Sequence, residues 1–212
     1  MFHVGIIWAG GLFLIGVFLK LYLWGPGKGS TLHKAAATFV SVLISLDGAL
    51  RFGGWAWVLF IAVLLCMAAD IWIQYSLIPG VLVFLSAHLF FIGWMALKGG
   101  VLSWNLLIGA AICGLLLWLY RRYLKGMGAQ AVFLSLYLLI LMSMLATALS
   151  LPFVSQSAGA SIIAGGASLF AASDLILGAS IVTGRKTELK DRLIMLFYEP
   201  AVFLLAVSVF YF

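Results

Sequence analysis

Two aspartates stand inside long apolar stretches of the sequence. Asp70 lies in the stretch CMAADIWIQYS and Asp174 in the stretch GASLFAASDLILGAS. A pair of carboxyl groups suits acid–base chemistry, because one that keeps its proton acts as the acid while an ionised partner activates water. We therefore take Asp70 and Asp174 as the candidate catalytic residues.

Further polar side chains fall within the apolar stretches, and we expect the proton-handling ones among them to support the two aspartates: His88, Tyr198 and Glu199. A polar stripe at helical spacing joins them, formed by Lys34, Thr38, Ser41 and Ser45. Each has a simpler alternative. A buried carboxyl group can be a structural hydrogen bond between helices, and a lysine near a helix end can reach the membrane interface.

The elements that position these residues are indicated by composition. The chain has 212 residues, of which 66% are hydrophobic and only 8% charged, and its mean hydropathy is +1.24. A soluble domain has about 25% charged residues. This composition excludes a soluble enzyme, a nucleic-acid-binding protein and a disordered linker, and it predicts a polytopic α-helical membrane protein.

Apolar runs between charged or Gly/Pro/Ser-rich breaks predict eight spans, at 2–24, 31–47, 55–77, 79–97, 101–120, 131–150, 159–183 and 193–212. The loops between them are short, so neighbouring helices run antiparallel in one bundle. We expect a single eight-helix transmembrane domain over residues 1–212. Three of the six acids, Asp47, Glu188 and Asp191, then fall at span ends or in loops.

Basic residues predict the orientation, because the side with excess Lys and Arg is cytoplasmic. One side carries only Arg51 and Lys98. The other carries ten basic residues, namely Lys20, Lys28, Lys34, Arg121, Arg122, Lys125, Arg185, Lys186, Lys190 and Arg192. Both termini should therefore face away from the cytoplasm. This distribution explains the net charge of +6 by topology, without a nucleic-acid partner.

Proline and cysteine positions complete the pattern. Pro200 is expected to be the only proline inside a span, where it removes a helical hydrogen bond beside Glu199 and suggests a hydrated cavity. Cys66 and Cys113 are far apart in the sequence and form no metal-binding spacing. We expect both cysteines to be inert, small apolar residues.

The polar stretches, taken in order, resemble the YhhN-like lysoplasmalogenase family of polytopic membrane proteins over nearly the whole chain. The resemblance is carried by a lysine that opens the second span, by Asp70, by the His88 segment GVLVFLSAHLFFIGW, by the Asp174 segment and by the last helix FYEPAVFLLAVS. The chain departs from the family in having Ala69 before Asp70 where Gly is usual, and Glu199 where Gln is common.

The resemblance implies hydrolysis of the vinyl ether bond of lysoplasmalogens with phosphoethanolamine or phosphocholine head groups, giving a fatty aldehyde and a glycerophospho-alcohol. It implies no metal or organic cofactor. Of the two aspartates, we favour Asp70 as the acid and Asp174 as the base. Lys34 and Arg192 would hold the substrate phosphate. The membrane would be a bacterial inner membrane or a eukaryotic endomembrane such as the endoplasmic reticulum.

Three other functions are compatible with carboxyl groups inside spans. A proton-coupled transporter uses them, although such proteins have broken helices in both halves. An intramembrane diaspartyl protease also uses two aspartates, but its Gly-Xaa-Gly-Asp motif is absent from the sequence before Asp174. A non-catalytic lipid-binding membrane protein is the third.

Overall fold

The computed structural model describes residues 2–25, 31–99 and 103–212, and within them the chain forms eight long helices. They are α1 (Phe2–Trp24), α2 (Thr31–Phe52), α3 (Ala56–Tyr75), α4 (Leu77–Gly99), α5 (Ser103–Leu124), α6 (Ala129–Val154), α7 (Ala158–Thr183) and α8 (Glu188–Val207). A short 3-10 helix, η1 (Ser208–Tyr211), follows α8. All eight are long and apolar enough to cross a membrane, which confirms the predicted all-α architecture with eight spans.

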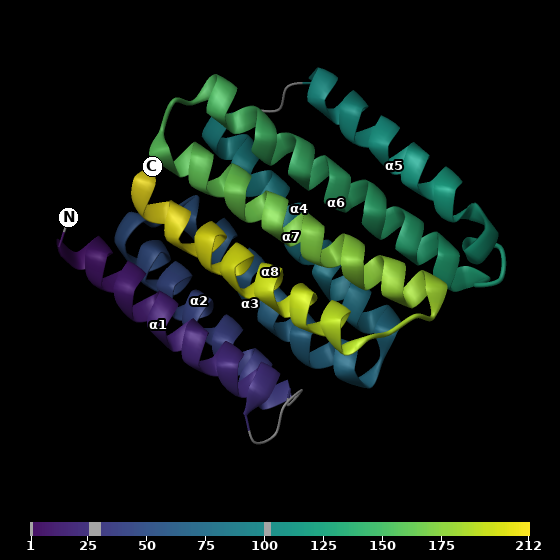
Figure 1. Cartoon of the computed structure of the whole chain (residues 1–212). Helices are drawn as coiled ribbons and strands as arrows, with labels where there is room; N and C mark the ends of the chain where they lie inside the picture. Colours follow the sequence, from purple (N-terminus) through teal and green to yellow (C-terminus); the bar gives the residue numbers. More distant parts are fainter. Residues whose placement is uncertain (1, 26–30, 100–102) are drawn as a thin grey trace.

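The helices lie side by side in a bundle, with α1 and α5 at opposite outer edges and α8 between α7 and α2 (Figure 1). The helices α2 and α8 are the most buried, whereas α1 and α5 expose most of their surface. Large aromatic side chains fill the interior, among them Phe91, Trp94, Phe170 and Phe203. The polar residues of interest therefore lie on the helices that form the centre of the bundle.

The helix α2 extends beyond the predicted end of its span at residue 47 and reaches Phe52. Asp47 consequently lies within the helix and not at its end. Its carboxylate pairs with Arg51, one turn later, at 2.8 Å, and such i,i+4 pairs favour continuation of a helix.

The connection between α7 and α8 is shorter than predicted because local capping signals define both ends. Gly184 adopts a positive φ of 66° after the last turn of α7, as is common at helix C-termini. The Thr187 side chain accepts a hydrogen bond from the Lys190 backbone N–H at 3.3 Å and caps α8. Glu188 and Asp191 therefore occupy the first turn of α8 and not a loop, where negative charge is favourable.

The expectation that only Pro200 lies inside a span is wrong, since Pro152 also lies inside a helix. Pro152 is in the last turn of α6. A proline there removes a single backbone hydrogen bond near the helix end, where the disruption is smallest. A single broken helix is consequently no longer an argument against a transporter.

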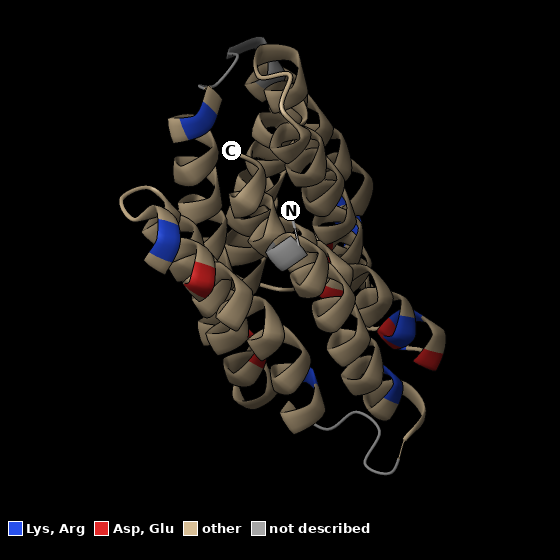
Figure 2. Cartoon of the chain, turned by 90° about the vertical axis from the view of Figure 1, so that its left-hand side faces the viewer, with Lys and Arg blue, Asp and Glu red and all other residues tan. Residues whose placement is uncertain are grey.

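Charged residues are sparse along the bundle, and most of the ribbon carries neither acids nor bases (Figure 2). Of the basic residues used to predict the orientation, Lys28 lies outside the described residues. Asp70, Asp174 and Glu199 are buried inside the bundle. These three buried acids are exceptions to the apolar interior, and they define the candidate site.

Candidate functional site

Asp70, on α3, is fully buried and is surrounded by three hydrogen-bond donors from α2 and α8. The Lys34 ammonium lies 2.7 Å from Oδ1 of Asp70. The hydroxyls of Thr38 and Tyr198 both donate to Oδ2 at 2.8 Å. Asp70 thus accepts two hydrogen bonds on Oδ2 and faces an ammonium group at Oδ1, an arrangement that favours the carboxylate form. We call Lys34, Thr38, Asp70, Tyr198 and Glu199 the Asp70 group.

Glu199 joins this group from α8 and is also fully buried. Its Oε1 lies 3.3 Å from the Thr38 hydroxyl oxygen, and within the described residues its Oε2 has no hydrogen-bond partner. Thr38 has a single hydroxyl proton, which the shorter contact directs to Asp70. The contact between Thr38 and Glu199 is therefore a hydrogen bond only when Glu199 carries a proton.

Asp174, on α7, has a different set of partners. The Tyr137 hydroxyl, from α6, donates a hydrogen bond to its Oδ2, and Nε2 of His88, from α4, lies 3.5 Å from the same oxygen. Nδ1 of His88 lies 2.6 Å from the Phe84 carbonyl oxygen, so Nδ1 must be the protonated nitrogen. Within the described residues Nε2 has no hydrogen-bond partner, and its contact with Asp174 is an ion pair only if the imidazole is protonated. We call His88, Tyr137 and Asp174 the Asp174 group.

Aromatic rings lie between the two groups. The Phe170 ring centroid is 4.9 Å from that of His88 and 5.4 Å from that of Tyr198. Among the described residues no hydrogen bond or ion pair joins Asp70 to Asp174. The structure thus brings the predicted residues together in two neighbouring groups, with no direct contact between the two carboxyl groups.

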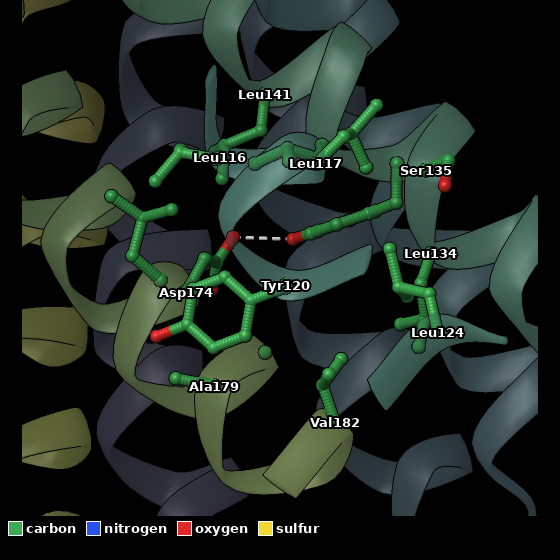
Figure 3. Close-up of a pocket in the computed structure, with 14 residues that line it drawn as sticks. Leu116, Leu117, Tyr120, Leu124, Leu134, Ser135, Leu141, Asp174, Ala179 and Val182 are labelled. Carbon is green, nitrogen blue, oxygen red and sulfur yellow. Dashed lines mark hydrogen bonds between the residues drawn. The ribbon is translucent and has the colours of Figure 1, made fainter. Parts of the chain in front are cut away.

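The Asp174 group borders a cleft. The cleft has a volume of about 150 Å³ and lies between α5, α6 and α7 (Figure 3). Most of its lining is leucine, including Leu116, Leu117 and Leu141, and the Asp174 carboxyl group lies among these apolar side chains. Apolar cavities with a few convergent polar groups are typical ligand sites. Asp174 is therefore the predicted catalytic residue that a ligand in this cleft can reach.

The two residues predicted to hold a phosphate engage different partners. Lys34 is drawn inward by Asp70, and only 12% of its side chain is exposed. The Arg192 guanidinium lies 3.3 Å from Glu188, one turn earlier on α8, and 5.7 Å from the centre of the Trp24 ring. Lys34 and Arg192 thus form ion pairs with different acids. Within the described residues the two do not form one phosphate site.

Sequence reasoning missed Tyr137 and gave Thr38 no role beyond the polar stripe. A signal for Tyr137 was present, since it is a lone phenol in the apolar run AVFLSLYLLILMS, and buried tyrosines usually find a hydrogen-bond partner. Thr38 links Asp70 to Glu199 across three helices, and no local pattern reveals such a link. Cys66 and Cys113 are buried free thiols, as expected.

Comparison with known proteins gives a single kind of match. A family model described as the YhhN family matches residues 29–209, which include both groups. No curated protein matches, and no solved structure matches.

Proposed function

Because the chain belongs to the YhhN family, we propose that it is a membrane-embedded hydrolase that cleaves the vinyl ether bond of lysoplasmalogens. The products are a fatty aldehyde and a glycerophospho-alcohol. The observation that carries this proposal is the position of Asp174, whose carboxyl group lies 3.5 Å from His88 and borders an apolar cleft. Protonation of a carbon atom in a lipid needs a general acid within reach of the lipid chain, and a carboxyl group beside an apolar cleft can be that acid.

In this scheme the reaction begins when a proton on Asp174 passes to the β-carbon of the vinyl ether. The C=C electron pair forms the new C–H bond, and the positive charge is spread over the adjacent carbon and the ether oxygen. Water adds to that carbon and loses a proton to Asp174, which is now a carboxylate. The resulting hemiacetal loses its hydroxyl proton, its C–O bond breaks, and the leaving alcohol oxygen takes up a proton. One water is consumed and the proton on Asp174 is restored.

In this scheme the roles of the two aspartates are the reverse of those favoured from the sequence. Asp174 is the acid and then the base. Asp70 forms an ion pair with the Lys34 ammonium and accepts hydrogen bonds from two hydroxyl groups, partners that favour its carboxylate form over a proton donor. It stabilises the positive charge of Lys34 and orients Tyr198 inside the bundle. Tyr137 and His88 are positioning residues that act through Asp174.

The test uses purified protein in detergent with lysoplasmenyl-phosphoethanolamine, and aldehyde release is measured. Asp174→Asn removes the carboxyl group with little change of shape, and we expect it to abolish aldehyde release. Asp47→Asn is the matched control, since Asp47 is partly exposed and lies outside both groups; it should retain the wild-type rate. A wild-type protein that releases no aldehyde from either ethanolamine or choline substrates would refute the proposed function.

The Asp70 group favours a second candidate, a proton-coupled transporter. Lys34, Asp70 and Glu199 place one cation beside two carboxyl groups in the membrane interior, which is a common arrangement in proton pathways. Proteoliposomes that acidify when lysophospholipid is added, with no aldehyde formed, would favour the transporter.

A further inference from the structure

The cleft extends from the bundle interior to one end of the bundle. Leu116, Leu117 and Leu141 lie on one side of the Asp174 carboxyl group, and Tyr120, Leu124, Ala179 and Val182 lie on the other (Figure 3). Leu124 is the last residue of α5, and Val182 is next to the last residue of α7. Eight residues separate Asp174 from Val182, which corresponds to about 12 Å along a helix. Asp174 is thus near the deep end of the cleft.

The volume of the cleft limits how much of a ligand it can hold. An apolar cavity of about 150 Å³ holds a molecule the size of benzene, and this cleft has about that volume. It therefore takes about six carbon atoms of one chain, and the rest of that chain lies outside the cleft. The outer helix α5 packs mainly against α6, so a single chain can enter from the lipid between α5 and α7.

Charge complementarity gives the orientation of the occupant. Exposed basic residues lie at the end of the bundle where the cleft ends, with Arg122 in the last turn of α5, Lys125 directly after it and Arg185 two residues after α7. Long basic side chains of this kind reach down to phosphate groups at a membrane surface. An anionic head group at this end leaves the chain directed toward Leu116, Leu117 and Leu141.

We propose that the α5–α6–α7 cleft binds a single-chain phospholipid, with its phosphate at the basic ends of α5 and α7 and the first chain carbons beside Asp174. This inference takes one thing from the proposed function, namely that the reacting bond is a vinyl ether. The phosphate site is then formed by Arg122, Lys125 and Arg185, in place of Lys34 and Arg192.

Gly178 provides a direct way to close the cleft. It lies on α7, one turn after Asp174, and lines the cleft. A Cβ atom added at Gly178 would meet no atom within 4 Å, so a larger side chain would extend into the empty space. Gly165, on the same helix, also has no atom within 4 Å of an added Cβ but does not line the cleft. Gly165→Phe is therefore the matched control for Gly178→Phe.

The probe is an ester-linked lysophosphatidylethanolamine that carries a diazirine near the carbonyl end of its chain and has no vinyl ether bond. After illumination, labelled peptides of the full-length protein are identified by mass spectrometry. We expect label on the cleft-lining segments 116–124, 134–141 and 175–182. Gly178→Phe should reduce this label about tenfold or more, while Gly165→Phe should leave it unchanged. If Gly178→Phe does not fold, Ala179→Phe fills the same space.

The phosphate site is tested by charge reversal. Arg122→Glu with Lys125→Glu should reduce labelling by this phosphate-containing probe but not by a diazirine fatty alcohol of the same chain length. Lys20→Glu, an exposed position on α1, should have no effect. Label on α1, α2 or α8, or label in the cleft that Gly178→Phe and Ala179→Phe leave intact, would overturn the inference. If cleft labelling is as expected and no aldehyde is released from lysoplasmalogens, the inference holds and the proposed function fails.

Discussion

Removal of the Lys34 charge is expected to destabilise the bundle, because it leaves the buried Asp70 carboxylate without its cation. Lys34 Nζ and Asp70 Oδ1 are 2.7 Å apart, and Asp70 is fully buried. At that distance and an effective dielectric constant of about 20, the attraction between two unit charges is about 6 kcal/mol. Part of this is recovered when Asp70 takes up a proton, and breaking buried pairs costs about 3–5 kcal/mol in practice. We expect a loss in this range for Lys34→Met.

An exposed ion pair on the same helix provides the matched control. Arg51 and Asp47 are 2.8 Å apart, but their side chains are 47% and 35% exposed. Water already solvates both charges, so Arg51→Met should cost at most about 0.5 kcal/mol. The two substitutions thus remove a similar N···O contact and differ mainly in burial.

The free energy of unfolding is measured by denaturation in detergent micelles for both variants and for the double variant Lys34→Met, Asp70→Asn. The double variant should recover most of the lost stability, because neither charge then remains buried alone. If Lys34→Met costs no more than Arg51→Met, or if the double variant is as unstable as Lys34→Met alone, the burial argument for the Asp70 group is wrong.

Three further outcomes test other parts of the structure. Asp174→Asn should lower the rate of aldehyde release by a factor of about 100 or more, and Tyr137→Phe by a factor of about 10 to 100, with the bundle still folded by circular dichroism. Thr38→Val removes the hydroxyl between two buried carboxyl groups and should lower the free energy of unfolding by about 1–3 kcal/mol; an unchanged value would contradict the bridging role. An added methyl at Gly48 would collide with the Val209 side chain, whereas one at Gly16 would meet nothing within 4 Å. Gly48→Ala should therefore lower the melting temperature, and Gly16→Ala should raise it slightly.

The fold was largely predictable because membrane helices follow from apolar length alone. The errors in the predicted boundaries lie at helix ends, where the run of apolar residues stops but the helix continues. Asp47 and Arg51 carry α2 beyond its apolar part, and the Thr187 cap starts α8 before its apolar part begins. Such ends depend on side-chain hydrogen bonds, which a hydropathy pattern does not detect.

The sequence was enough to predict which acids belong to the site, but not how they divide between the Asp70 group and the Asp174 group. The rule that buried acids are rare and functional identified Asp70, Asp174 and Glu199. It could not divide them, because the division depends on which helices pack together. Tyr198 reaches Asp70 across 128 residues of sequence, and Tyr137 reaches Asp174 from a neighbouring helix. These partners follow from packing, and only the finished bundle reveals them.

The different partners of the two aspartates lead to different expectations for their substitution. Asp70 balances a lysine, so loss of its charge leaves a buried ammonium group with no counter-charge. Asp174 is paired with a histidine and a phenol, and a proton that leaves it leaves no permanent cation behind. An acid must change its charge during each reaction cycle, and the Asp174 carboxylate left after proton transfer keeps its hydrogen bond from Tyr137 and faces the positive charge formed on the substrate. Substitution of Asp70 should therefore change stability first, and substitution of Asp174 should change catalysis first.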